Sequence, residues 1–156
     1  MTTSVFEIIG LAENRAMQFD LPFPKENPKL LITVRRMPQT FVNSAQFLAD
    51  GNLRERHVAF GDPAWGALNY ARLCYEIVEF MKTHATGWRA VDGSELKEPC
   101  NSVTVSRWVD ELELLDRQDL GRAYFKAVEE DQKKLTPAAS GDQDSSTPSE
   151  NGSSTT

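Results

Sequence analysis

The sequence predicts an α+β protein that is mainly helical, with a small N-terminal antiparallel β-hairpin and a disordered C-terminal tail. Three observations carry this prediction. Apolar and polar residues alternate over residues 17–23, as in a half-buried strand. Apolar residues recur at helical spacing through most of residues 39–135. After Leu135 there is no aromatic residue and no aliphatic side chain larger than alanine.

Length and composition suit one globular domain with a short extension. The chain has 156 residues, of which 40% are hydrophobic and 26% charged, so it can bury a sizeable core. We expect one globular domain over residues 1–135. Residues 136–156 are rich in Ser and Thr and cannot bury enough apolar area to offset their ordering entropy. This tail is either a linker or solubilising arm, or a dispensable terminus.

The charge and the apolar runs exclude some classes of partner. The formal net charge of −6 disfavours a nucleic-acid-binding surface, which needs clustered Lys and Arg. No stretch approaches the roughly 20 apolar residues of a membrane span. The N-terminus has no basic region before its apolar run, so a signal peptide is not expected. We therefore expect a cytoplasmic protein without nucleic-acid or membrane partners.

The first strand of the hairpin is predicted over residues 17–23 and the second over residues 29–37, which contain the β-branched run ITV. The letters KENP between them supply a turn. Two strands alone are marginal, so helices must cover one face of the hairpin. The preceding segment, residues 4–16, fits either a strand or a short helix.

A first helix is predicted after Pro38. Phe41, Ala45 and Leu48 share one of its faces, and Asp50-Gly51 is expected to end it.

The next helix, from Asp62 to His84, carries the central prediction. Asp62 suits the N-cap and Pro63 the first helical position. Its polar residues form one narrow stripe, which comprises Asn69, Arg72, Glu76, Glu79 and Lys82 or Thr83. The remaining arc is apolar and much wider than that of a surface helix. This helix is therefore either central in the core or shares a face with another chain.

The stretch GWRAVDGSEL then predicts a structural corner. Gly87 is expected to end the helix, and Arg89–Val91 to form a short strand. Asp92-Gly93 would make a tight turn and Glu95-Leu96 the returning strand. We expect Trp88 to pack over the end of the preceding helix.

Two further helices complete the domain. One begins near Asn101, with Ser102 or Thr104 as its cap, and the other runs from Asp116 to Leu135. Their expected apolar faces comprise Val105, Trp108, Leu112 and Leu115 in the first, and Leu120, Tyr124, Ala127 and Val128 in the second.

No motif for catalysis or metal binding is present. His57 and His84 lack a ligand partner at helical spacing, and the carboxylate pairs fall on predicted solvent faces. Cys74 and Cys100 belong to no CxxC pair. Two reduced thiols are expected, although a disulfide between them stays open. We therefore expect no catalytic residue, no metal and no cofactor, and a binding or assembly protein rather than an enzyme.

The order of these elements resembles tail assembly chaperones of long-tailed, siphovirus-type bacteriophages. The resemblance spans roughly residues 60–130 and rests on a connector of the form GW-x-x-V-x-DG followed by a helix pair. The matching residues are Gly87, Trp88, Val91, Asp92 and Gly93, then Val109, Leu112, Leu115, Leu120 and Ala123. The Ser/Thr-rich end departs from the family.

The resemblance implies a non-enzymatic protein that binds the tape-measure protein, or another tail protein, in the host cytoplasm before the tail tube polymerises. It also implies self-association, absence from the mature particle and, in some members, a frameshifted longer form. The alternatives are a structural tail or connector component of the virion, and a small regulator that binds a host protein.

Four aromatic residues are candidates for partner binding: Trp65, Trp88, Trp108 and Tyr124. Tryptophan and tyrosine often dominate the binding energy of protein interfaces. Core packing is the alternative role for each of them.

Overall fold

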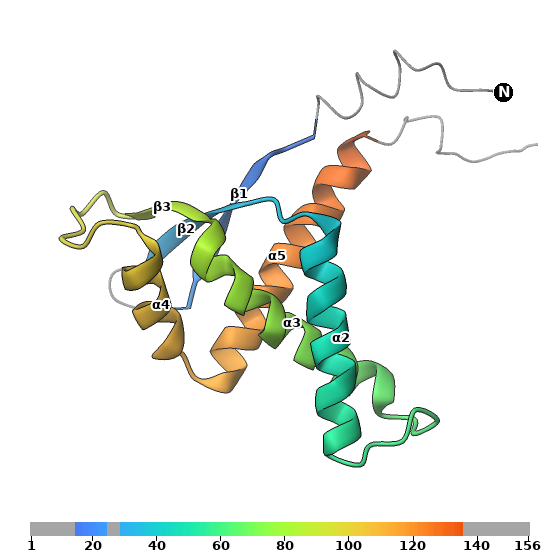
Figure 1. The fold of residues 1–156 in the computed structure, drawn as a ribbon. Coiled ribbons are helices and arrows are strands. Elements are labelled where there is room, and N and C mark those ends of the chain that lie inside the picture. The colour runs from blue at the N-terminus through green and yellow to red at the C-terminus, as the bar shows by residue number, and fades with distance from the viewer. Residues whose placement is uncertain (1–14, 25–28, 136–156) are drawn as a thin grey trace, which may run out of the picture. The chain divides into compact units, whose positions relative to one another are not determined.

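The computed structural model describes residues 15–24 and 29–135 of the chain. Its elements, in chain order, are β1 (Gln18–Phe23), β2 (Leu30–Arg35), α2 (Gln39–Glu55), α3 (Trp65–His84), β3 (Ala85–Ala90), α4 (Ser102–Asp110) and α5 (Leu114–Leu135) (Figure 1). The predicted tail at 136–156 and the predicted turn at 25–28 lie outside the described residues, as does most of the ambiguous segment 4–16.

The chain divides into two units. The larger, Met17–Ala127, contains the three strands, α2, α3, α4 and the first part of α5. The other comprises Met1–Ala16 with Val128–Thr156. In the described part of that second unit, the backbone N–H of Ala16 donates a hydrogen bond to Asp131 Oδ2 at 3.1 Å.

The predicted antiparallel hairpin is confirmed. Phe19 pairs with Val34 and Leu21 with Ile32, and these four side chains are buried on the same face. Residues between them in β1 are exposed, which is the alternation expected of a sheet with one solvated face.

Helices cover the buried face of this hairpin. Phe19 contacts the ring of Tyr124 from α5 edge-on, with centroids 6.0 Å apart. Phe23 contacts Trp108 from α4, with centroids 5.8 Å apart. The marginal stability of two strands is thus met by helical packing, as predicted.

A third strand, β3, pairs antiparallel with β2, so the described sheet has the order β1-β2-β3 and is larger than the predicted hairpin. Two predictions are wrong here: α3 ends at His84 and Gly87 lies inside β3, while residues 95–96 form no strand. The free edge of β2 pairs with β3 at five positions, with a bulge between Thr33 and Val34, in a sheet already buried on one face. A local hairpin of two or three residues would satisfy fewer backbone groups.

Helix α2 does not end at Gly51 but continues to Glu55. Its buried stripe is Ala45, Ala49 and Leu53, whereas Leu48, predicted to face inward, is 51% exposed. The i, i+4, i+8 spacing of this stripe is one ridge of a helix, and its two alanines permit close packing on α3. The burial of Leu53 beyond Gly51 favours continuation of the helix through the glycine.

The helix predicted from Asp62 to His84 is present as α3, which begins at Trp65. The N-cap position of α3 is Ala64, not Asp62 as predicted. Asp62 Oδ1 instead accepts a hydrogen bond from the N–H of Ala64, at 2.7 Å, in the turn that precedes the helix. The buried residues lie in the C-terminal half, and they are Cys74, Glu76, Ile77, Val78 and Met81.

Helix α4 is capped by Asn101, not by Ser102 or Thr104 as predicted. The Asn101 side chain accepts from the N–H of Thr104 at 3.0 Å, and Thr104 Oγ1 accepts from the N–H of Asn101 at 3.2 Å. Thr104 is therefore the reciprocal partner in a capping box. Because α4 ends at Asp110 and α5 begins at Leu114, Leu115 leaves the predicted apolar face and is 71% exposed.

Among the described residues, no helix is long and apolar enough to cross a membrane.

Candidate partner-binding surface

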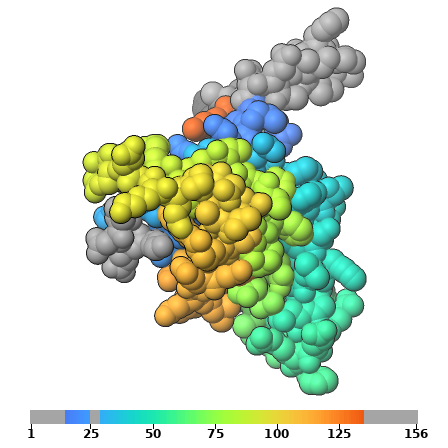
Figure 2. All heavy atoms as spheres, turned by 60° about the vertical axis from the view of Figure 1, so that its left-hand side comes forward, coloured from blue at the N-terminus to red at the C-terminus, as the bar shows by residue number. Residues whose placement is uncertain are grey.

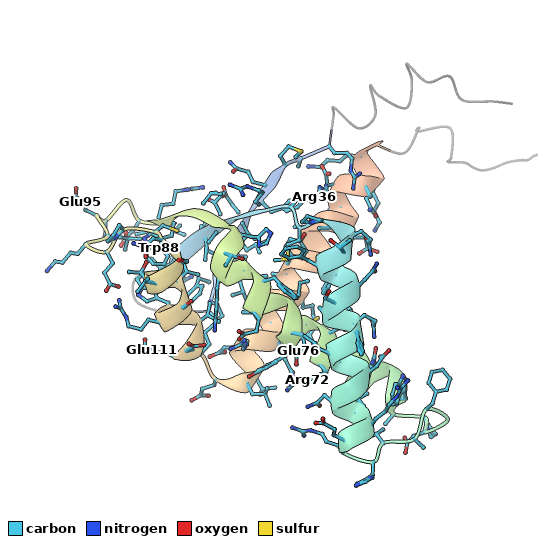
Figure 3. The ribbon with its side chains drawn as sticks, viewed as in Figure 1. Arg36, Arg72, Glu76, Trp88, Glu95 and Glu111 are labelled. Atoms are coloured by element: carbon cyan, nitrogen blue, oxygen red, sulfur yellow. The ribbon has the colours of Figure 1, made fainter. Side chains whose placement is uncertain are left out.

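Trp88 and Trp108, two of the predicted partner-binding residues, stack on each other. Their ring centroids lie 3.8 Å apart with an angle of 12° between the planes. Trp88 comes from β3 and Trp108 from α4, so the stack joins the edge of the sheet to that helix (Figure 3). Trp88 packs on α4 and not, as predicted, over the end of the preceding helix.

Glu98 holds both indoles in place. Its backbone carbonyl accepts a hydrogen bond from Trp88 Nε1 at 3.0 Å, and its Oε1 accepts from Trp108 Nε1 at 2.6 Å. Its other carboxylate oxygen pairs with Arg107. In the space-filling view, the connector after β3 lies against α4 as one surface (Figure 2). Glu98 therefore fixes the connector to the tryptophan pair, so its role here is to stabilise the fold.

Tyr124, the third candidate, lies in the core of the larger unit. Its side chain is 2% exposed, and its hydroxyl accepts a hydrogen bond from the N–H of Met37 at 2.8 Å. Burial raises the pKa of this phenol. Trp108 is 8% exposed. Neither ring is presented to a partner in this structure.

Trp65, the fourth candidate, stands at the start of α3, where the chain returns from α2. Its ring contacts Phe60, with centroids 5.4 Å apart, and Phe60 is 82% exposed. The pair lies at the end of the α2–α3 hairpin that is remote from the sheet (Figure 1).

Apolar side chains remain exposed from the middle of α2 to the first half of α3. The N-terminal half of α3, from Trp65 to Leu73, contains no buried residue although its sequence is largely apolar. We call the exposed or half-buried apolar set on these two helices and their loop the hairpin surface: Phe47, Leu48, Phe60, Trp65, Leu68 and Tyr70. The two halves of α3 therefore differ: its C-terminal half is core, and its N-terminal half has only exposed or half-buried residues.

A hollow of about 440 Å³ lies beside α2. It is lined by Asn43, Gln46, Phe47, Asp50, Gly51 and Arg54. These residues follow one another at spacings of three, one, three, one and three, so they occupy a single face of the helix. We call this hollow the α2 groove.

The polar stripe of α3 is partly buried. Arg117 of α5 lies over it, 5% exposed, with its guanidinium 4.2 Å from the ring centroid of Tyr75 and paired with Glu79. Glu76 is 8% exposed and pairs with Arg72 at 2.7 Å. Both residues lie on α3 and are labelled in Figure 3. Burial lowers the pKa of Arg117.

These charges satisfy one another. Lys82 Nζ contacts Glu79 at 3.1 Å and Asp110 at 2.7 Å, and Arg117 reaches Asp110 at 3.8 Å. Each carboxylate in the cluster has a cationic partner, which is the pattern of an inter-helix ion-pair network rather than of an acid/base pair poised for catalysis.

The histidines and cysteines do not assemble a reactive site within the described residues. His57 is exposed, and His84 Nδ1 lies 2.7 Å from the carbonyl oxygen of Phe80. Cys74 and Cys100 are both free thiols, and burial raises the pKa of each. In the part of the chain that the structure describes, no group of three or more His, Cys, Asp or Glu side chains is placed to hold a metal ion.

Sequence reasoning missed the two features that organise this region. The role of Glu98 cannot be predicted from the sequence, because nothing in its local sequence shows that two indole N–H groups converge on it. The α2 groove cannot be predicted from a helix that ends at Gly51, because its lining continues to Arg54. One observation in the sequence indicates the groove: at helical spacing, Phe47 does not lie on the same face as Ala45, Ala49 and Leu53, so its ring is expected to be exposed.

Comparison of the chain with protein-family models, with curated proteins and with solved structures gives no match.

Proposed function

We propose that this protein is a non-enzymatic tail assembly chaperone of the kind made by long-tailed bacteriophages, and that it binds the tape-measure protein in the host cytoplasm during tail morphogenesis. The observation that carries the proposal is the N-terminal half of α3, which is largely apolar but contains no buried residue. A helix that is core at one end and leaves apolar side chains exposed at the other favours a protein-binding role.

The chemistry of the hairpin surface supports binding to a helical client. Phe47 is 68% exposed, Leu48 51% and Leu68 44%, all on helices rather than in loops. Apolar side chains on rigid helices suit the apolar stripe of an amphipathic helix, and a long helical client offers many such stripes. The net charge of −6 keeps a protein with this much exposed apolar area soluble.

Co-expression with the tape-measure protein of the same genome tests the proposal. The full chain should co-purify with that protein, and the double variant Phe47→Ser, Leu68→Ser should lose most of the complex. Leu115→Ser, which removes a leucine at least as exposed as Phe47 and Leu68 from the start of α5, is the matched control and should retain the complex. Failure of the unmodified chain to co-purify overturns the proposal.

Mass spectrometry of purified particles separates the proposal from its closest alternative. A chaperone is absent from the mature particle, whereas a structural tail or connector component is present. Capture of a host protein in place of a tail protein points instead to a small regulator.

A further inference from the structure

We propose that the α2 groove receives one amphipathic helix of the partner, and that this helix brings a large apolar side chain to Gly51 and a carboxylate to Arg54. The inference rests on the proposed function and names the chemistry of the partner at that site.

The form of the groove argues for a helix as its occupant. Its lining runs from Asn43 to Arg54 along one face of α2, a length of about 16 Å at 1.5 Å per residue. A hollow that follows a helix for three turns matches a second helix laid alongside it better than a compact small molecule. Phe47 forms a rim, 68% exposed.

Gly51 leaves open space in the lining of the groove. A β-carbon at Gly51 would meet no atom within 4 Å, so the space above it is open. A residue without a side chain in the middle of an exposed helical face leaves a hole of the kind that an apolar knob from a neighbouring helix fills.

The charged residues of the groove favour a partner helix that carries negative charge. Asp50 Oδ1 accepts hydrogen bonds from Asn69 at 2.6 Å and from Gln46 at 2.8 Å, so its carboxylate is engaged by amides. Arg54, one turn further along, makes no ion pair with any described residue. An exposed guanidinium beside an exposed phenylalanine favours a partner helix whose apolar stripe is flanked by Glu or Asp.

Two designed peptides of the same length test the inference by fluorescence anisotropy with the full chain. Both carry a leucine stripe at helical spacing, flanked by Glu in one peptide and by Lys in the other. The Glu-flanked peptide should bind about tenfold more tightly than the Lys-flanked one. Gly51→Leu, which fills the groove, and Arg54→Glu, which reverses its charge, should each weaken the binding of the Glu-flanked peptide about tenfold.

Ser102→Leu is the matched control, because Ser102 is an exposed small residue of a helix, α4, and lies outside both the groove and the hairpin surface. It should bind like the unmodified chain. Equal binding of the two peptides, no binding of either, or no effect of Gly51→Leu each overturns the inference.

Sedimentation equilibrium tests whether the groove is occupied by a second copy of this chain. A dimer that Gly51→Leu converts to a monomer assigns the groove to a second copy of this chain and also overturns the inference. The proposed function fails separately: it is lost when the unmodified chain does not bind the tape-measure protein, and it survives when the tape-measure protein binds equally well to Gly51→Leu.

Discussion

Gly121 of α5 lies directly against the backbone of Cys74 of α3. A β-carbon at Gly121 would stand 2.6 Å from the carbonyl carbon of Cys74 and 2.8 Å from its Cα. Because these are backbone atoms, no side-chain rotation relieves the clash. The absence of a side chain at Gly121 is thus what allows the two helices to cross at this distance.

Gly121→Ala should therefore destabilise the protein, by at least about 2 kcal/mol in the free energy of unfolding. The clash outweighs the gain in helix propensity of up to about 1 kcal/mol that the same change brings in an open helix. Urea denaturation followed by circular dichroism measures the difference.

Gly51→Ala provides the control, since Gly51 is also helical but open. It should leave the protein equally stable or raise its stability by up to about 1 kcal/mol. Similar effects of the two substitutions would show that the α3–α5 crossing is not limited by Gly121.

Local sequence patterns predicted the elements in which apolar residues recur at the period of a strand or of a helix. The alternation in β1 and the spacing in α3 needed only the position of apolar residues, and both elements are present. The third strand was predicted only in part, because the expected strand Arg89–Val91 overlaps the last two residues of β3 and misses the first four. Residues 85–90 contain Thr, Gly and Arg, and they become a strand because β2 has an edge to pair with.

The same limit applies to the candidate site. The aromatic residues could be named from the sequence, but their roles depend on tertiary neighbours. Trp108 and Tyr124 are held in the interior by Glu98 and Met37, which lie 10 and 87 residues away in sequence. Trp65 lies where the chain enters α3, whose first half contains no buried residue.

His57 supplies a second prediction, because it adopts a left-handed conformation with φ 61° just after α2. The N–H of His57 donates to the carbonyl of Arg54 at 3.0 Å, and that of Val58 to the carbonyl of Leu53 at 3.0 Å. These two bonds are those of a Schellman motif, whose left-handed position favours glycine.

His57→Gly should stabilise the protein by about 1 kcal/mol, because it removes the steric cost of a side chain at positive φ. His57→Ala keeps a β-carbon there and should bring no such gain. The midpoints of thermal unfolding of the two variants decide the question, and an equal rise in both would attribute the effect to loss of the imidazole.

Glu98 carries a third prediction. Glu98→Ala leaves the half-buried N–H of Trp108 without its acceptor and should cost about 1–3 kcal/mol in unfolding free energy. Glu98→Gln keeps an acceptor oxygen and loses only the ion pair with Arg107, which is partly exposed, so it should cost less than about 1 kcal/mol.

Near-ultraviolet circular dichroism reports on the same change. The signal of the Trp88–Trp108 stack should weaken in Glu98→Ala and persist in Glu98→Gln. Glu95→Ala, an exposed carboxylate of the same connector that is labelled in Figure 3, should alter neither the stability nor the spectrum. If Glu98→Ala and Glu98→Gln had the same stability and the same spectrum, the hydrogen bond from Trp108 to Glu98 would not be what holds the stack in place.

Tyr124 gives a prediction about pH. Burial raises the pKa of its phenol above the ordinary value of 10.0. The unfolded chain therefore ionises this group at a lower pH than the folded chain does, so the stability that Tyr124 contributes is fully present below about pH 10 and declines as the pH rises further.

Tyr124→Phe removes both the titration and the acceptor for the N–H of Met37, which is buried, and should cost about 1–3 kcal/mol at pH 8. When unfolding free energies are measured from pH 8 to pH 11, the advantage of the unmodified chain over the variant should shrink above pH 10, because every other titrating group is common to both. An advantage that stays constant or grows over that range would mean that the phenol of Tyr124 ionises as readily in the folded chain as in the unfolded one.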